Sequence, residues 1–178
     1  MARFEMIDEV LVHEGPVISV FDGRFRSPDG EVLRREVVRH PGAVVVVPVI
    51  GAEAVLVRQY RAPIDATILE IPAGKRDVPG EDPTQTARRE LAEEVGLAAG
   101  NLELLCEFHN TPGFCDEYSY CFLATNCESV DDDRQGVEEV HMTIERVELA
   151  RVPELIADGT ITDGKSIIGL MMARDRLL

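Results

Sequence analysis

One predicted helix, within Gly74–Leu97, constrains the fold of this chain more than any other feature, because residues typical of helix caps stand at both of its ends. Asp82 can cap its N-terminus, Pro83 suits the first helical position, and Gln85 follows as a capping-box partner. Gly96 is typical of the residue at which a helix ends. Apolar residues recur between these signals at four-residue spacing, at Ala87, Leu91 and Val95. We therefore expect a helix with one face buried in the core.

The same helix carries three glutamates on a second face, at Glu90, Glu93 and Glu94. This spacing brings their carboxylates together, and like charges at such spacing repel each other. Arg89 can reach Glu93, which leaves Glu90 and Glu94 under-compensated. A divalent cation would remove the repulsion, and ligands that are all oxygen suit Mg²⁺ or Mn²⁺. Taken alone, the pattern also fits an exposed acidic helix that binds nothing.

Over its full length the segment resembles the Nudix box, Gly-x5-Glu-x7-Arg-Glu-U-x-Glu-Glu-x-Gly-U, in which U is aliphatic. The matching residues are Gly74, Glu81, Arg89, Glu90, Leu91, Glu93, Glu94, Gly96 and Leu97. One extra residue separates Gly74 from Glu81, in the loop at Pro79-Gly80. It should lengthen a turn without moving the carboxylates. So many matching positions make the resemblance specific.

The rest of the chain reads as strands followed by helices. Residues 1–40 hold three short strand patterns, and we expect a small antiparallel β subdomain there. The apolar run Ala43–Ile50 predicts a strand buried on both faces. Further strands are expected at 54–60, 68–71, 102–108, 119–124 and 140–147, and closing helices at 152–157 and 165–177. This order predicts an α/β fold, and the resemblance implies a Nudix-type α/β/α sandwich with a mixed sheet over residues 41–178.

Charge and composition exclude several classes of partner. The chain has 18 basic and 33 acidic residues, a formal net charge of −15. Such a surface repels nucleic acid and anionic membranes, so we expect neither as a partner. The apolar runs are too short for a membrane span, which needs about 20 residues. The four cysteines include no Cys-x-x-Cys pair, which favours a reducing cytoplasm.

Features outside the box resemble the ADP-ribose pyrophosphatase subgroup of the Nudix hydrolases. They are the Pro112-Gly113 pair followed by Glu117, the segment Val57–Arg61, and the Leu69–Gly74 lead-in to the box. Pro112-Gly113 alone could equally be an ordinary turn. The N-terminal appendage is also similar to one that often swaps across a homodimer in these enzymes. The resemblance therefore implies a homodimer that hydrolyses ADP-ribose to AMP and ribose 5-phosphate.

The resemblance also implies the metal site. Its ligands would be the Ala73 carbonyl and the carboxylates of Glu90, Glu93 and Glu94, holding two or three Mg²⁺ ions, with Mn²⁺ as an alternative. Arg89 would hold the carboxylates in place and, with Glu93, counts among the catalytic residues. Glu81 is either an outer residue of the metal site or a surface acid ahead of the helix.

The general base and the substrate contacts come from other parts of the chain. Ligating carboxylates have their lone pairs committed, so the resemblance places the base in the acidic segment 131–139, with Glu139 the first choice and Glu138 the second. Both could instead be solvated acids ahead of a strand. The adenosine and ribose contacts implied by resemblance are Arg35, Glu36, Arg61 and Glu117, with Phe21 or Phe114 stacking on the base. Arg35 could instead belong to the polar face of an edge strand.

Two other functions fit the same residues. One is hydrolysis of another nucleoside diphosphate sugar, such as GDP-mannose or a UDP-sugar, because the residues of the box act on the diphosphate and do not recognise the base. The other is a non-catalytic Nudix module that senses ADP-ribose. Such modules usually lose carboxylates of the box, whereas Glu90, Glu93 and Glu94 are all present here.

Overall fold

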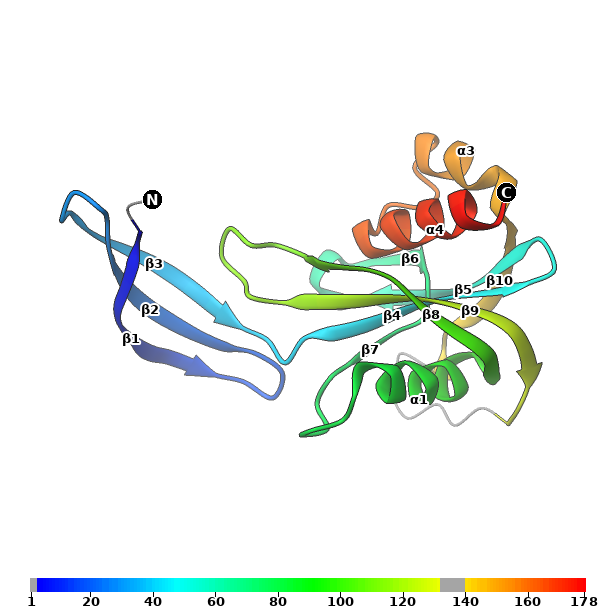
Figure 1. The fold of residues 1–178 in the computed structure, drawn as a ribbon, viewed down its shortest axis with the longest axis horizontal. Coiled ribbons are helices and arrows are strands. Elements are labelled where there is room, and N and C mark those ends of the chain that lie inside the picture. The colour runs from blue at the N-terminus through cyan, green and yellow to red at the C-terminus, as the bar shows by residue number, and fades with distance from the viewer. Residues whose placement is uncertain (1–2, 132–139) are drawn as a thin grey trace. The chain divides into compact units, whose positions relative to one another are not determined.

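The valine-rich run Ala43–Ile50 forms strand β4 of a mixed sheet in the computed structural model, which describes residues 3–131 and 140–178 (Figure 1). Strand β9 (Tyr118–Ser129) pairs with β4 in parallel along one edge. On the other edge, β7 (Ala73–Lys75) pairs with the start of β4, and β5 (Glu53–Arg61) pairs with its end. Residues 43–49 are all buried, which confirms a strand covered on both faces.

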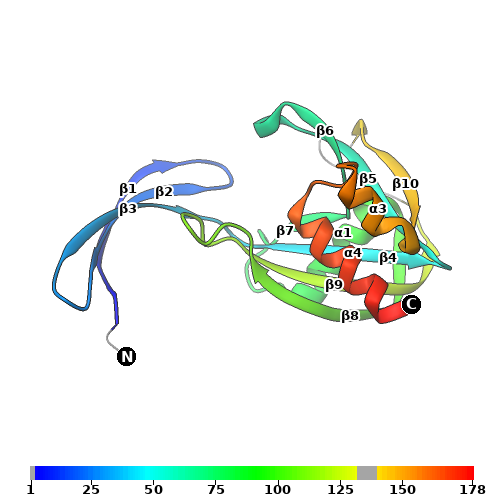
Figure 2. The ribbon, with the colours of Figure 1, turned by 90° about the horizontal axis from the view of Figure 1, so that it is seen from above.

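The sheet has the strand order β10-β5-β4-β9-β8, with β6 on β5 and β7 on β4. The remaining strands are β6 (Ala66–Glu70), β8 (Leu97–His109) and β10 (Thr143–Glu148). Helix α1 (Pro83–Val95) covers one face, and α3 (Val152–Ala157) and α4 (Gly164–Leu177) cover the other (Figures 1 and 2). Two single-turn helices, Ala62–Ile64 and Leu149–Arg151, follow β5 and β10. The expected α/β sandwich with a mixed sheet is confirmed. Within the described ranges, no helix is long and apolar enough to cross a membrane.

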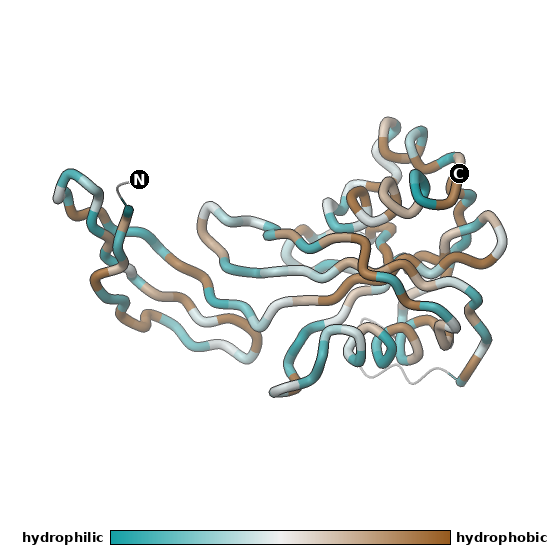
Figure 3. Tube along the Cα trace, in the orientation of Figure 1, coloured by the Kyte–Doolittle hydropathy of each residue, from teal (hydrophilic) through white to brown (hydrophobic). Residues whose placement is uncertain are grey.

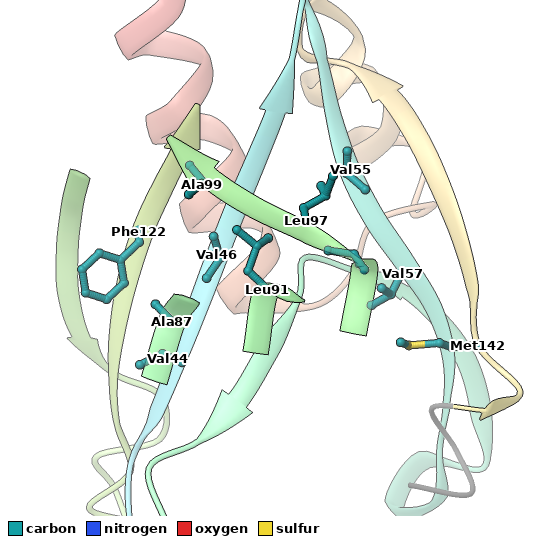
Figure 4. Packing of buried hydrophobic residues seen from close by; sticks show 12 residues of the cluster. Val44, Val46, Val55, Val57, Ala87, Leu91, Leu97, Ala99, Phe122 and Met142 are labelled. Atoms are coloured by element: carbon teal, nitrogen blue, oxygen red, sulfur yellow. The ribbon is translucent and has the colours of Figure 1, made fainter. Parts of the chain in front are cut away.

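Helix α1 packs on β4 and β5 through the apolar face expected from its spacing. Ala87 and Leu91 are fully buried and lie against Val44 and Val46 of β4 (Figure 4). Burial of one such leucine stabilises the fold by about 1.5–3 kcal/mol. The Asp82 carboxylate accepts a hydrogen bond from the Thr84 backbone amide at 2.8 Å, which satisfies one of the free donors of the first turn. The helix therefore begins and ends where its sequence predicts.

The C-terminal stop of α1 is a left-handed glycine. Gly96 has φ 62° and ψ 41°, a conformation that costs glycine little because it has no Cβ. At the other end, Gln85 contributes its backbone amide, which donates to the Asp82 carbonyl at 2.9 Å.

Residues 43–107 and 119–178 form one compact unit, unit 2, and the other residues form unit 1. Unit 1 contains a three-stranded antiparallel sheet of β1 (Glu5–Glu14), β2 (Ser19–Arg26) and β3 (Val32–Arg39). It also contains Phe108–Tyr118, a segment distant in sequence. The Val38 amide donates to the Phe114 carbonyl at 2.8 Å, and the Asp116 amide donates to the Val38 carbonyl at 3.1 Å. This segment therefore adds to the edge of β3, which the strand pattern of residues 1–40 does not reveal.

Apolar residues recur along the strands of unit 1 (Figure 3), and many of their side chains are exposed. On β1, the exposed fractions are 54% for Met6, 65% for Val10 and 67% for Val12. An apolar sheet face of this kind usually marks an interaction surface.

The strand expected from Val140 begins later, and this prediction was wrong in its first residues. β10 starts at Thr143, which pairs with Arg58 of β5. Met142 is 3% exposed and belongs to the core cluster under α1, whereas Val140 is largely exposed (Figure 4). Met142 is thus buried ahead of the first residue that pairs with β5.

Hydrogen bonds of the capping residue Asp163 and of Ser166 connect the N-terminus of α4 to the sheet. The Asp163 carboxylate accepts from the Ser166 amide at 2.8 Å and from the Ser166 hydroxyl at 2.7 Å, and it pairs with Lys165 at 2.5 Å. Ser166 Oγ in turn accepts from the Ile71 amide at 2.9 Å. Burial opposes ionisation of Asp163, but the charge of Lys165 and these hydrogen bonds outweigh it and lower the pKa of Asp163.

Asp163→Asn is expected to destabilise the protein by about 1–3 kcal/mol at pH 7, because it removes a largely buried charged acceptor. A carboxyl with a lowered folded pKa stabilises above its ordinary pKa of about 3.9 and loses that stabilisation as the pH falls toward the folded value. The difference between the variant and the wild type should therefore shrink at pH 3. Urea unfolding at both pH values measures it, and an equal difference at the two would contradict the assignment.

Candidate active site

Strand β7 places a backbone carbonyl beside α1. Ala73 faces Val45 across the β4–β7 pair, and the flanking hydrogen bond runs from the Val46 amide to the Pro72 carbonyl at 2.9 Å. In this register Ala73 exchanges no hydrogen bonds with Val45, so its amide and carbonyl both point away from β4. The amide is bound by Glu94 Oε2 of α1 at 3.0 Å. The Ala73 carbonyl is thus directed to the side on which Glu94 lies.

Glu90 lies against the backbone of β7 because residue 74 has no side chain. A Cβ on Gly74 would lie 1.8 Å from Glu90 Cδ. Burial of the Glu90 carboxyl raises its pKa to about 7; the positive charge of Arg89 opposes this, and repulsion from Glu93 adds to it. A carboxylate in such a position is stabilised by a nearby cation.

The Arg89 guanidinium contacts three glutamates, which are Glu81, Glu90 and Glu93. Its Nη1 lies 2.8 Å from Glu90 Oε1 and 3.0 Å from Glu93 Oε2. Its Nη2 lies 3.3 Å from Glu81 Oε2. The expectation that Arg89 pairs with Glu93 and leaves Glu90 aside was therefore wrong, because Arg89 also reaches Glu90, its own neighbour in the sequence.

Glu81 serves to hold Arg89. Its Oε2 also accepts from the Thr86 hydroxyl at 2.8 Å, and the hydrogen bonds from Arg89 and Thr86 lower the pKa of Glu81. The contact with Arg89 is a third role for Glu81, beside the outer metal-site residue and the surface acid that the sequence suggests. The extra residue at Pro79-Gly80 leaves this contact intact.

The donor set suits a hard divalent cation, but its side chains are not arranged around one. Among the described residues, no three Asp, Glu, His or Cys side chains are gathered closely enough to hold a metal ion. Glu90 and Glu93 turn toward Arg89, and Glu94 turns toward the Ala73 amide. The candidate ligand atoms where β7 meets α1 are all oxygens, and oxygen is the ligand atom that Mg²⁺ and Mn²⁺ prefer. The residues therefore fit such an ion chemically, while in this structure Glu90 and Glu93 bind Arg89 and Glu94 binds the Ala73 amide.

Unit 1 contains a cavity of about 460 Å³ between β3 and the segment 109–116. Its lining includes three of the residues expected at the substrate, which are Arg35, Glu36 and Phe114. Phe21 does not line it, whereas Phe25 does. The two phenylalanines share a face of β2 because they are four residues apart, so strand periodicity could have pointed to Phe25. The cavity combines aromatic and aliphatic walls with a guanidinium, as ligand sites commonly do.

The other expected substrate residues lie in both units. Glu117 belongs to the added segment of unit 1, with its Oε1 4.0 Å from His40 Nδ1. Arg61 belongs to unit 2, where its Nε donates to Glu70 Oε2 at 2.7 Å. Glu138 and Glu139 lie outside the described residues. Sequence reasoning did not identify Glu70, although a glutamate just ahead of the box in an otherwise apolar run was a usable signal.

Comparisons with known proteins agree on one family. A family model described as NUDIX domain matches residues 39–167. The ADP-ribose pyrophosphatase of Bacillus subtilis (strain 168) is 36% identical over 156 residues, covering 87% of this chain and 84% of that protein. The ADP-ribose pyrophosphatase of Mycobacterium tuberculosis (strain ATCC 25618 / H37Rv) is 36% identical over 169 residues, covering 94% and 82%. A crystal structure of an ADP compounds hydrolase has a TM-score of 0.83 at 23% identity, covers 98% of this chain and 94% of that one, and shares the fold.

Proposed function

Because this chain belongs to the NUDIX domain family, we propose that it hydrolyses the diphosphate linkage of ADP-ribose to AMP and ribose 5-phosphate, with Mg²⁺ as the metal. The chain is a Nudix hydrolase. The observation that carries the substrate is the 36% identity to two ADP-ribose pyrophosphatases over most of their length. The complete set of glutamates at the junction of β7 and α1 supports catalysis rather than binding alone.

The proposed metal ligands are the Ala73 carbonyl and the carboxylates of Glu90, Glu93 and Glu94, for two or three ions. When bound, Mg²⁺ or Mn²⁺ neutralises the charge of the diphosphate and acidifies a bound water. Glu94 lies on α1 and accepts a hydrogen bond from the Ala73 amide of β7, so it connects the two elements that carry the proposed ligands. Arg89 holds the carboxylates of Glu90 and Glu93 through ion pairs, and Glu81 holds Arg89 in the same way.

The cavity of unit 1 suits the adenosine part of the substrate. Phe25 and Phe114 offer apolar faces on which a base can stack, and Arg35 offers a guanidinium for stacking or hydrogen bonding. Arginines at the substrate also matter because the net charge of −15 repels a diphosphate elsewhere on the surface. We propose Arg35, Glu36 and Phe114 for this part of the site, with base stacking by Phe21, as the resemblance implies, or by Phe25, which lines the cavity.

An activity screen tests the proposed substrate directly. Purified protein with Mg²⁺ is offered ADP-ribose, GDP-mannose and a UDP-sugar, and release of AMP, GMP and UMP is quantified. We expect AMP to form fastest. Faster release of GMP or UMP would favour the alternative substrates. Binding of ADP-ribose without any turnover would instead identify a sensor module.

Glu139→Gln is expected to lower kcat about 100-fold with little change in the Mg²⁺ dependence, because a general base contributes 10²–10⁴-fold without ligating the metal. Glu138→Gln is the matched control, one residue away and of the same charge, and should have a small effect. If Glu138→Gln cripples the enzyme and Glu139→Gln does not, the order of the two is reversed. If neither matters, the base lies elsewhere.

We further propose that residues 1–40 form a dimerisation subdomain, that residues 41–178 form the hydrolase domain, and that the enzyme is a homodimer in the cytoplasm. The apolar residues of β1 are exposed and would be stabilised by burial against another surface, and a small isolated sheet is marginally stable. A second copy of the chain is the proposed cover. All four cysteines are free, which is compatible with a reducing compartment.

Mixing two inactive variants tests whether the dimer shares its sites. If Arg35 of one subunit completes the site that contains Glu94 of the other, a heterodimer of Arg35→Ala and Glu94→Gln subunits contains one intact site. We then expect activity to return on mixing after subunit exchange. Sites built from single chains would show no such recovery, and a fully active monomer in sedimentation at micromolar concentration would remove the dimer altogether.

A further inference from the structure

A buried glutamate just ahead of the candidate metal site lies between two cations. Glu70 ends β6 and is 2% exposed. Its Oε2 accepts from Arg61 Nε at 2.7 Å, and its Oε1 lies 4.0 Å from Lys165 Nζ. A carboxylate buried to this degree is costly unless it is paired. Neither the metal ligands nor the general base accounts for its presence.

Glu70 binds only one edge of the Arg61 guanidinium. The contact uses Nε, and the Arg61 side chain remains 38% exposed. Within the part of the chain that the structure describes, the two terminal nitrogens of Arg61 make no hydrogen bond or ion pair. Because the guanidinium is planar and rigid, anchoring Nε also sets the direction of the unused donors. Arg61 therefore presents its outer edge in a defined orientation.

The second oxygen of Glu70 faces a cation that is itself held in place. Lys165 pairs with Asp163 at 2.5 Å, and Asp163 caps helix α4. The same cap residue accepts from Ser166, whose hydroxyl accepts from the amide of Ile71, the neighbour of Glu70. This network joins β5, β6 and α4, so the Glu70 carboxylate is constrained from both sides.

Arg61 is held close to the candidate metal site. Glu70 and Ala73 are three residues apart, so their Cα atoms are separated by at most about 11 Å. Resting on the proposed function, we propose that Glu70 is a positioning residue that directs the outer edge of Arg61 toward a non-bridging oxygen of the substrate diphosphate. A guanidinium edge suits this ligand because it can donate two parallel hydrogen bonds to one phosphate. Arginine can present one edge to Glu70 and a separate, planar pair of donors to a phosphate, whereas lysine offers only a single ammonium.

Glu70→Gln is expected to raise KM about tenfold while changing kcat less than twofold, because it disorients a group that contributes uniform binding. Arg61→Ala should raise KM at least as much. The double variant should match Arg61→Ala rather than show the product of the two effects, since Glu70 acts only through Arg61. The result that overturns the proposal is a folded Glu70→Gln protein with unchanged KM, or with an effect that multiplies with that of Arg61→Ala.

Glu145→Gln is the matched control. Glu145 binds Nε of Arg58, three residues earlier on β5, and the side chains of Arg58 and Arg61 are similarly exposed, although the Glu145 side chain is 37% exposed and that of Glu70 only 3%. Its loss removes an arginine–glutamate pair from the same strand, but Arg58 lies on the opposite face of that strand. We expect KM to stay within twofold of the wild type, and a rise equal to that of Glu70→Gln would attribute both effects to weakened structure.

Arg61→Lys decides the question if Glu70→Gln does not fold. A lysine at this partly exposed position keeps the charge next to Glu70, so stability should be retained. It cannot donate two parallel hydrogen bonds to a phosphate, and KM should rise about tenfold; an unchanged KM overturns the proposal. If the wild type does not hydrolyse ADP-ribose, the proposed substrate fails. The same variants are then compared on the nucleoside diphosphate sugar that the screen identifies, or by calorimetric Kd for ADP-ribose if nothing is hydrolysed.

Discussion

Glu94→Gln is expected to lower turnover about 1000-fold while leaving the fold intact. Glu94 is 4% exposed, and its Oε2 accepts from the Ala73 amide at 3.0 Å. The amide oxygen of glutamine can accept the same hydrogen bond, so packing between α1 and β7 should be retained. It is uncharged, however, and binds Mg²⁺ far more weakly than a carboxylate. A loss of about 4 kcal/mol of transition-state stabilisation corresponds to this factor.

Three measurements on the Glu94→Gln variant separate chemistry from folding. They are kcat at saturating Mg²⁺, thermal unfolding, and the affinity for ADP-ribose. We expect only the first to change by more than a few-fold. Glu154→Gln, an exposed glutamate on α3, is a control with the same chemical change and should behave as the wild type. Near-normal turnover of Glu94→Gln at saturating Mg²⁺ would remove Glu94 from the metal site.

Gly74→Ala is expected to abolish most activity by displacing Glu90. The added Cβ would lie 1.8 Å from Glu90 Cδ, a distance that two non-bonded carbon atoms cannot keep. The atom in its way belongs to the end of a flexible side chain, so Glu90 should turn aside at a cost of only about 1–3 kcal/mol in stability. Turnover should then fall about 1000-fold, as it would for Glu90→Gln, because both changes remove the same carboxylate from the site.

Gly164→Ala provides the matched control for the glycine substitution. Gly164 begins α4, and no atom lies within 4 Å of a Cβ built there. Alanine favours a helix over glycine, so this variant should be as stable as the wild type or slightly more so. Turnover by both variants is measured with ADP-ribose and Mg²⁺. If Gly74→Ala retains normal activity, Glu90 does not need to lie against β7.

The helix α1 and the strand β4 could be predicted because their signals are local. Asp82 and Gly96 cap the helix through groups a few residues away, and the spacing of Ala87, Leu91 and Val95 alone defines the buried face. The run of valines in β4 leaves no polar face to expose, so burial on both sides follows from composition. The glutamates of the candidate site could be named for the same reason, since their grouping on one helix face depends only on helical geometry.

The contacts of those side chains could not be predicted in the same way. Whether Arg89 also binds Glu81 depends on how the loop at Pro79-Gly80 returns to the helix. The course of that loop depends on atoms far outside any local pattern. Burial raises the pKa of Glu90, and burial is a property of the packed structure rather than of the helix sequence.

By itself, the sequence of this protein determined the elements, the α/β class and the residue types at the candidate site, because propensity, capping and periodicity act over a few residues. Only the tertiary structure decided that Phe108–Tyr118 adds to the edge of β3, that Phe25 rather than Phe21 lines the cavity, and that Glu70 lies between Arg61 and Lys165. These contacts join residues far apart in the chain, and their free energy comes from shared burial and paired charges. Such contributions exist only once the strands and helices have packed against each other.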